Sequence, residues 1–273
     1  METNQTSPKR RERFPPPPNL PPADTWYGWG LFLARQWADL QVASVLQHLR
    51  PWLASRAGDL LEVGCGAQPY RHFVPGACTY RGLECQGSEE HFGYKAPDTS
   101  YYSGGRFPFD DSAFDAVFLT EVLEHVYDTV PFLQECCRVL KPNGELFLAV
   151  PFQARYHYIP YDFWRFTPAS LERRLGEAGF EGITVAARGT DLTVAAYKIL
   201  SVLYRWFSGG GVGRIAAFMM SPLGVVTLAI GHATLHVPLG SDDDCLGFVA
   251  KARRPRDIID NRPLPPDGKS YRH

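Results

Sequence analysis

The stretch DLLEVGCGAQP, residues 59–69, joins a short apolar run to a glycine-rich turn. The apolar run is typical of a short buried strand. Gly64 and Gly66 follow it directly, and glycine lets the backbone approach a ligand where a Cβ atom would collide. In open α/β sheets, ligands bind at the carboxyl ends of the strands. The stretch therefore predicts a ligand-binding turn at the end of a parallel strand.

Strand and helix patterns alternate on both sides of this turn. Further strands are expected at residues 79–83, 115–119, 145–150 and 246–251, and helices at residues 31–53, 128–140 and 167–179. In the first of these helices, Trp37 and Leu40 can share one apolar face. The last has Thr167 as its N-cap, Pro168 at its first position and Gly179 at its end. Such alternation is typical of right-handed βαβ units, so the sequence predicts an α/β fold with a mainly parallel sheet.

The acid at the end of the second expected strand, Glu84, is placed to accept hydrogen bonds from ribose hydroxyls; an exposed strand-end acid is the alternative. The dinucleotide fingerprint G-x-G-x-x-G would require glycine where this chain has Pro69. No GK[ST] sequence follows the turn either, so a phosphate-binding loop is not indicated. These observations favour a ligand with an adenosine-like part and no pyrophosphate.

Four segments in order resemble motifs of the class I S-adenosylmethionine-dependent methyltransferases, of the methyltransferase type 11 kind. They are EVGCG at 62–66, FPFDDSAFD at 107–115, TEVLEHV at 120–126 and RVLKPNGE at 138–145, and a weaker likeness continues through PYDFWRFT at 160–167 and EAGF at 177–180. The resemblance implies a Rossmann-like fold. Its mainly parallel seven-stranded sheet would carry helices on both faces and a helical insertion before the last strand.

The resemblance also implies a cofactor, S-adenosyl-L-methionine, whose product is S-adenosyl-L-homocysteine. Matched residue by residue, the cofactor-binding positions are Glu62, Gly64, Gly66, Glu84, Thr120 and Glu121. Gly64 and Gly66 would line the cofactor, Glu62 would face its methionine end, and Glu84 would hold the ribose. Thr120 and Glu121 would lie near the methionine moiety. Ser103 departs from the family pattern, because an acid usually occupies this position and pairs with the adenine.

Methyl transfer to an oxygen or nitrogen needs a group that removes the acceptor's proton. The candidates are His125, after the fourth strand, and His157 and Asp162, after the fifth. His125 has an alternative as a surface or pocket-shaping histidine. Arg165 is a candidate anion clamp, although Asp162 and Arg165 lie three residues apart and can instead pair with each other.

Composition excludes other classes of protein. The 273 residues are 45% hydrophobic, which rules out a wholly disordered chain, and 28 basic residues balance 29 acidic ones, so no nucleic-acid partner is expected. The six cysteines form no CxxC pair, so no metal site and no disulfide framework are expected; free thiols favour the cytoplasm. Proline-rich tails are expected at residues 1–23 and 255–273, around a single domain at 24–254.

An apolar segment at 192–239 departs from a minimal methyltransferase and is expected to be a helical insertion. No charged residue lies between Ile215 and Gly231, but Pro222 and Gly224 interrupt this stretch, so a membrane-spanning helix is not expected. Two alternatives remain. We favour a lid packed over the substrate cleft. The other is a peripheral membrane contact through residues 195–231, with Lys198, Arg205 and Arg214 at the headgroups.

The sequence therefore predicts methyl transfer from S-adenosylmethionine to a small-molecule or lipid-like acceptor. One alternative is a catalytically silent cofactor-binding protein, which Ser103 favours and the intact glycine turn and Glu84 oppose. A nicotinamide oxidoreductase is less favoured, because Pro69 breaks its fingerprint.

Overall fold

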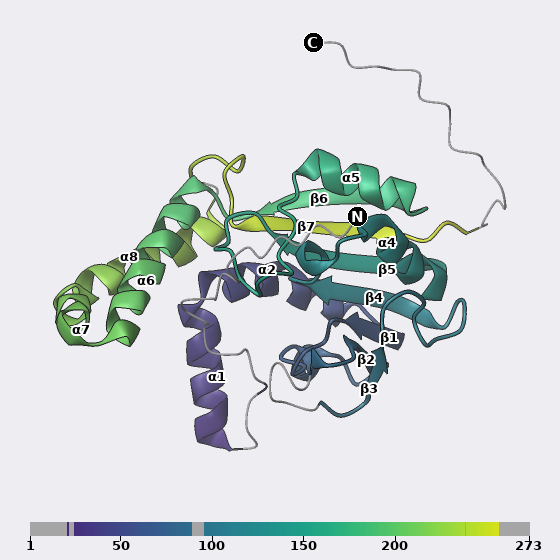
Figure 1. The fold of residues 1–273 in the computed structure, drawn as a ribbon, viewed down its shortest axis with the longest axis horizontal. Coiled ribbons are helices and arrows are strands. Elements are labelled where there is room, and N and C mark those ends of the chain that lie inside the picture. The colour runs from purple at the N-terminus through teal and green to yellow at the C-terminus, as the bar shows by residue number, and fades with distance from the viewer. Residues whose placement is uncertain (1–20, 22–24, 89–95, 238, 257–273) are drawn as a thin grey trace, which may run out of the picture.

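The computed structural model describes residues 21, 25–88, 96–237 and 239–256. Most of the two expected tails, at 1–23 and 255–273, lies outside the described residues. Within them, a seven-stranded sheet forms the centre of the molecule (Figure 1). Its strands, in spatial order, are β3 (Thr99–Tyr102), β2 (Cys78–Cys85), β1 (Gly58–Val63), β4 (Phe114–Thr120), β5 (Leu140–Pro151), β7 (Gly247–Arg253) and β6 (Glu181–Arg188). All neighbouring strands are parallel except β7, which runs antiparallel to both β5 and β6.

Helices cover both faces of this sheet, as predicted. Successive strand residues point to opposite faces, and the buried side chains divide accordingly. Leu61, Val117 and Leu148 join a core with α4 (Thr129–Val139) and α5 (Pro168–Glu177). Leu60, Phe118 and Phe147 join a second core with α2 (Leu40–Ala54). Because both faces of the central strands are buried in this way, the sequence of each is a nearly continuous apolar run.

The helix expected at 31–53 is in fact two helices, α1 (Trp26–Ala38) and α2. The break is at Asp39, whose side chain accepts hydrogen bonds from the backbone N–H groups of Gln41 and Val42 and so caps α2. The prediction that Trp37 shares the buried face was wrong, because Trp37 lies before the break and is half exposed. The N-cap expected at Thr167 is confirmed: its hydroxyl accepts from the backbone N–H of Ser170.

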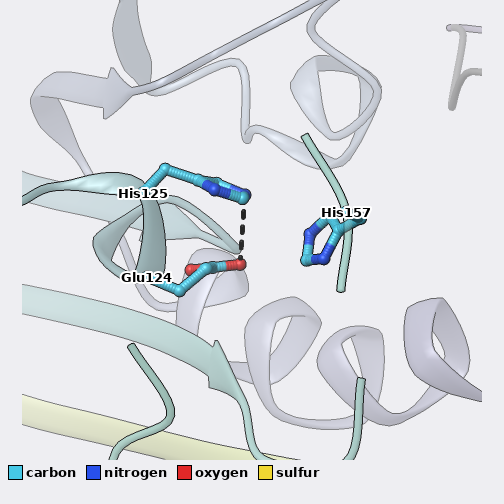
Figure 2. Close-up of side chains that lie close together, drawn as sticks. All are labelled: Glu124, His125 and His157. Atoms are coloured by element: carbon cyan, nitrogen blue, oxygen red, sulfur yellow. Dashed lines mark ion pairs between the residues drawn. The ribbon is translucent and has the colours of Figure 1, made fainter. Parts of the chain in front are cut away.

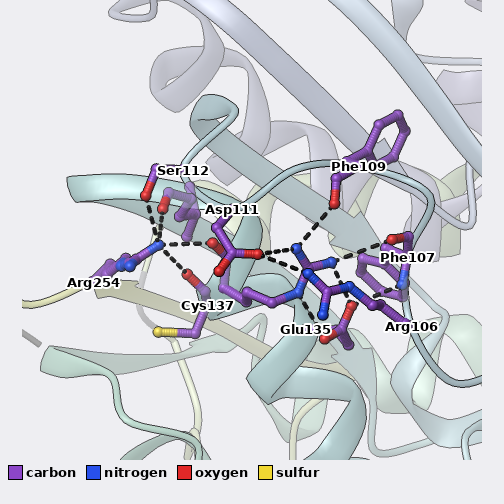
Figure 3. Close-up of polar contacts among 10 residues, drawn as sticks. Arg106, Phe107, Phe109, Asp111, Ser112, Glu135, Cys137 and Arg254 are labelled. Atoms are coloured by element: carbon purple, nitrogen blue, oxygen red, sulfur yellow. Dashed lines mark hydrogen bonds and ion pairs between the residues drawn. The ribbon is translucent and has the colours of Figure 1, made fainter. Parts of the chain in front are cut away.

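A polar network holds two of the motifs that the sequence shares with methyltransferases (Figure 3). Arg138, at the end of α4, donates to the backbone oxygens of Phe107 and Phe109 and to the carboxylates of Asp111 and Glu135. Arg254 donates to backbone oxygens at residues 137, 138 and 140. The segments at 107–115 and 138–145 are therefore structural. They fix the loop before β4 against the end of α4.

The helical insertion consists of α6 (Asp191–Gly209), α7 (Gly211–Met219) and α8 (Ser221–His236). In Figure 1 these helices project from the side of the sheet where β5 ends, with α7 farthest from the sheet. α1 lies on the same side, and the ring of Trp37 stacks on that of His232 in α8 with 5.0 Å between centroids. No single helix among the described residues is long and apolar enough to cross a bilayer. The pair α7 and α8, bent by 63°, meets those criteria only when taken together.

Candidate active site

The glycine-rich turn leaves β1 in a backbone conformation that glycine adopts readily. Gly64 and Gly66 both have positive φ angles, +68° and +49°. A Cβ atom on Gly64 would lie 2.4 Å from a methyl group of Val122, so a side chain has no room there. The backbone N–H of Gly64 donates to the carbonyl of Leu83 in β2. The turn is thus fixed at the carboxyl edge of the sheet.

Glu84, near the end of β2, contacts this turn directly. One carboxylate oxygen accepts from the backbone N–H of Gly66 at 2.9 Å, and the other accepts from the backbone N–H of Cys85 at 2.9 Å. The carboxylate is therefore oriented by two backbone donors beside the glycine turn. A carboxylate retains free lone pairs after two such bonds, and these can accept from the hydroxyls of a ribose.

Glu62 lies beneath the turn and is almost completely buried. The hydroxyl of Tyr80 donates to one of its oxygens. Burial raises the pKa of Glu62 to about 8, and the hydrogen bond from Tyr80 offsets only part of this shift. A buried carboxylate of this kind would be stabilised in its charged form by a positively charged group of a ligand.

Thr120 and Glu121 lie at the end of β4, on the same edge of the sheet. Glu121 has a positive φ angle of +55°, and its carboxylate pairs with the guanidinium of Arg188 at 2.7 Å. Arg188 is fully buried at the end of β6 and also donates to the carbonyl of Val150. Sequence reasoning missed Arg188, because β6 was not predicted and no local motif marks it. Its contacts fix the ends of β4, β5 and β6 relative to one another.

The two candidate histidines come together, although 32 positions separate them in the sequence. His125 ends a short 3₁₀ helix (Leu123–His125), and His157 lies in the segment after β5. Their rings are 4.9 Å apart between centroids and meet edge to face. The carboxylate of Glu124 lies beside them (Figure 2). Burial lowers the pKa of His125 to about 4, so this imidazole is neutral at pH 7.

Asp162 lies next to this pair, but its carboxylate already has partners. Both of its oxygens accept from the guanidinium of Arg165, and one lies 3.2 Å from Nδ1 of His157. The Arg165 guanidinium helps to hold the pKa of Asp162 below its usual value, against the opposing effect of burial. The structure therefore favours the ion pair over the anion clamp for Arg165. Asp162 is placed to orient His157, and its assignment as a base stays a prediction.

Ser103, the expected departure from the family pattern, is exposed just after β3. Its hydroxyl donates to the side-chain oxygen of Gln86 at 2.5 Å. This position therefore offers no carboxylate to an adenine.

Comparisons with known proteins agree with this geometry. Residues 61–148 match the family described as "Methyltransferase domain". This part of the chain is a methyltransferase domain. A protein of Mycolicibacterium smegmatis, named a probable S-adenosylmethionine-dependent methyltransferase, is 29% identical over 147 residues, which are 50% of this chain and 56% of that protein. The human mitochondrial ubiquinone biosynthesis O-methyltransferase is 63% identical over 35 residues, which are 13% of this chain and 10% of that protein.

The fold of the methyltransferase domain has counterparts among solved structures. A SAM-dependent methyltransferase from Archaeoglobus fulgidus superposes with a TM-score of 0.50 at 13% identity, over 84% of this chain and 100% of that one. The predicted fold class, family and cofactor, S-adenosylmethionine, are thus confirmed. The matched residues span 56% of the Mycolicibacterium smegmatis protein and 10% of the human one, so they leave the acceptor open.

The residues present fit the cofactor. Gly64 and Gly66 place backbone without side chains at the edge of the sheet, and the carboxylate of Glu84 beside them can accept hydrogen bonds from a ligand. Glu62 is a buried carboxylate that pairs with no cation among the residues that the structure describes. An adenosine with a charged methionine tail presents hydroxyls and an ammonium group that complement these two acids.

Proposed function

We propose that this protein transfers the methyl group of S-adenosylmethionine to a lipid-like acceptor at an anionic membrane surface. The observation that carries the cofactor part is the glycine turn with Glu62 and Glu84 at the carboxyl edge of the sheet. The observation that carries the acceptor part is an apolar surface on α1, α7 and α8, which is described below.

On the cofactor side, Glu84 would hold the ribose and Glu62 the methionine ammonium, while Thr120 and Glu121 would line the path to the methyl group. When bound, the cofactor supplies an activated methyl group for in-line displacement. The protein then aligns the acceptor and accepts its proton. His157 is favoured as the proton acceptor, because its Nδ1–H faces Asp162 and the carbonyl of Arg155, which leaves Nε2 as a lone-pair acceptor.

The proposed role of Glu62 makes cofactor affinity depend on pH. With a pKa of about 8, Glu62 holds a proton in the free protein at pH 7, and an ammonium group in contact with it favours the ionised form. Binding should therefore release a proton below pH 8. We expect affinity for S-adenosylhomocysteine to rise about tenfold from pH 6 to pH 7 and to level off above about pH 8, because one pKa unit corresponds to tenfold.

Calorimetry in two buffers of different ionisation enthalpy measures both the affinity and the released proton. Glu62→Gln, which cannot ionise, should bind more weakly and without this pH dependence. A wild-type affinity that is constant from pH 6 to pH 8 would refute the role of Glu62.

The proposal of a lipid-like acceptor is based on apolar side chains that are exposed here and that a lid packed over the cleft would bury. In α7, Val212, Phe218 and Met219 are 83%, 76% and 74% exposed, and Trp26 at the start of α1 is 90% exposed. Other exposed apolar side chains on these helices are Trp29, Leu31, Leu33, Trp37, Ile215, Leu223, Val225, Val226 and Ile230. Large exposed apolar surfaces mark protein or membrane interaction sites, and these three helices carry many such side chains. We therefore favour membrane contact over the lid that the sequence favoured.

The charges on the helical insertion and on α1 favour an anionic bilayer as the partner. α6, α7 and α8 carry three basic residues, Lys198, Arg205 and Arg214, and one acidic residue, Asp191 at the start of α6. α1 carries Arg35 and no acid. An apolar face bordered by basic residues is typical of helices that lie in the headgroup region of one leaflet.

Flotation with lipid vesicles tests this contact. We expect the protein to float with vesicles that contain phosphatidylglycerol, and less with phosphatidylcholine alone or at high salt, because salt screens the basic residues. The double variant Phe218→Glu, Met219→Glu should bind at least about 100-fold more weakly, since each buried side chain contributes about 1.5–3 kcal/mol.

Tyr127→Glu is the matched control, because Tyr127 is an exposed aromatic residue outside α1, α7 and α8. It should float like the wild type. A protein that stays in solution with every vesicle contradicts the membrane contact. A dimer by light scattering that the double variant disrupts would show instead that a second copy covers this face. Cofactor binding without transfer to any vesicle lipid would support the catalytically silent alternative.

A further inference from the structure

Three side chains that can bind a metal ion meet at the carboxyl edge of the sheet: Glu124, His125 and His157 (Figure 2). One ligand atom from each lies within 4.8 Å of the other two, and Nε2 of His125 is 3.6 Å from a carboxylate oxygen of Glu124. They come from two segments that the fold brings together, the 3₁₀ helix after β4 and the loop after β5.

Glu124 has an unusual environment. Its side chain is completely buried, and neither carboxylate oxygen has a hydrogen-bond partner among the residues that the structure describes. Burying a carboxylate without a partner is costly, and such groups normally pair with a cation, bind a metal or take up a proton.

The two imidazoles present acceptors rather than donors to this carboxylate. Nδ1 of His125 is 2.9 Å from the carbonyl oxygen of Tyr161, and Nδ1 of His157 is 2.9 Å from that of Arg155. A carbonyl oxygen only accepts, so each Nδ1 carries a hydrogen, and the neutral tautomer of each ring has its lone pair on Nε2. Metal-binding histidines show this arrangement, in which the second nitrogen donates to a carbonyl or carboxylate. Asp162 supplies the carboxylate beside His157.

We propose that Glu124, His125 and His157 bind one divalent transition-metal ion, of which Zn²⁺ is the best match. Two imidazole nitrogens and one carboxylate form a donor set that zinc and iron sites use. Ligand atoms around a tetrahedral zinc ion lie about 3.3 Å apart, close to the 3.6 Å between His125 and Glu124. The ring of His157 is half-buried, and a small movement toward Glu124 and His125 would complete the set of ligands. The cysteine pattern gave no sign of this site, because none of its ligands is a cysteine and His157 lies 32 positions after His125.

The ion would have a coordination position left for solvent or for an oxygen of the acceptor. This second part rests on the proposed methyl transfer. In that case Nε2 of His157 binds the ion and no longer accepts the acceptor's proton, and an acceptor hydroxyl bound to the ion would lose its proton to water more readily. The binding site itself does not depend on the reaction.

The test uses the full chain, treated with a chelator and titrated with Zn²⁺ in the absence of cofactor. We expect one equivalent of Zn²⁺ to bind and to raise the melting temperature. Glu124→Gln and His157→Gln should each weaken binding by about 100-fold or more, whereas His236→Gln, at the exposed end of α8, should bind like the wild type. Unchanged melting temperatures without metal would show that the variants are folded.

The six free cysteines could bind Zn²⁺ in place of the proposed site. Substituting Co²⁺ distinguishes the two kinds of site, because thiolate ligands give a charge-transfer absorption that nitrogen and oxygen ligands lack. A cobalt spectrum without thiolate bands, lost in Glu124→Gln, supports the site. Absence of Zn²⁺ binding by the wild type, or equal binding by Glu124→Gln, overturns it and leaves Glu124 as a buried protonated acid. Binding of S-adenosylhomocysteine by the same protein is measured separately, so failure of the metal site and failure of the proposed function are distinguishable.

Discussion

Gly66→Val should abolish measurable binding of S-adenosylhomocysteine. Gly66 has a φ angle of +49°, which a β-branched residue adopts only with strain. Its backbone N–H also donates to Glu84, so a shifted turn would move that carboxylate too. The valine side chain would occupy the face of the turn that the ligand needs. Since a strained turn and a blocked site act together, we expect a loss of affinity beyond the range of calorimetry.

The control for this variant is Gly182→Val. Gly182 has a similar φ angle of +60° near the start of β6, at the opposite edge of the sheet, and a Cβ atom there would meet nothing within 4 Å. It should lose stability as Gly66→Val does, by about 1–2 kcal/mol, and bind S-adenosylhomocysteine normally. If Gly66→Val is folded and binds like the wild type, the turn is not the cofactor site.

Arg188→Met should cause the largest loss of stability. The guanidinium is completely buried, donates to Glu121 at 2.7 Å and to the carbonyl of Val150 at 2.8 Å, and crosses three strand ends. Removing one partner of a buried ion pair costs about 3–5 kcal/mol. We expect the lower part of this range, because Glu121 is partly exposed and water can reach it. The melting temperature should fall by roughly 6–12 °C.

Two further variants show whether the ion pair is responsible. Arg173→Met removes an exposed pair with Glu177 in α5 and should change the melting temperature by less than about 2 °C. The double variant Glu121→Gln, Arg188→Met should recover part of the loss, because no charge is then left unpaired. A single Arg188→Met variant as stable as the wild type would exclude a structural role for the pair.

The glycine turn and Glu84 could be predicted from the sequence because their signal is local. A strand, a turn and the next strand end lie within 26 residues, and parallel pairing places them at one edge of the sheet. The caps at Thr167 and Gly179 are local in the same sense. The break between α1 and α2 at Asp39 could not be predicted from the apolar pattern, because a helical pattern continues through this residue. Only the hydrogen bonds that the Asp39 side chain accepts show that α1 ends there.

Arg188 and Glu124 could not be predicted in the same way. Arg188 reaches Glu121 across 67 positions, and it is the one fully buried residue of β6, whose other residues are half-buried or exposed. The sequence marks both histidines as candidates, but as separate bases. Their contact, and the carboxylate of Glu124 between the two segments, depend on how the loop after β5 folds over the end of β4.

Calorimetric titration of the wild-type protein with S-adenosylhomocysteine and, separately, with NAD is the decisive test of the cofactor assignment. We expect one molecule of S-adenosylhomocysteine to bind per chain, with release of a proton at pH 7, and no measurable heat from NAD. The absence of any binding of S-adenosylhomocysteine, or binding of NAD in its place, would contradict the assignment.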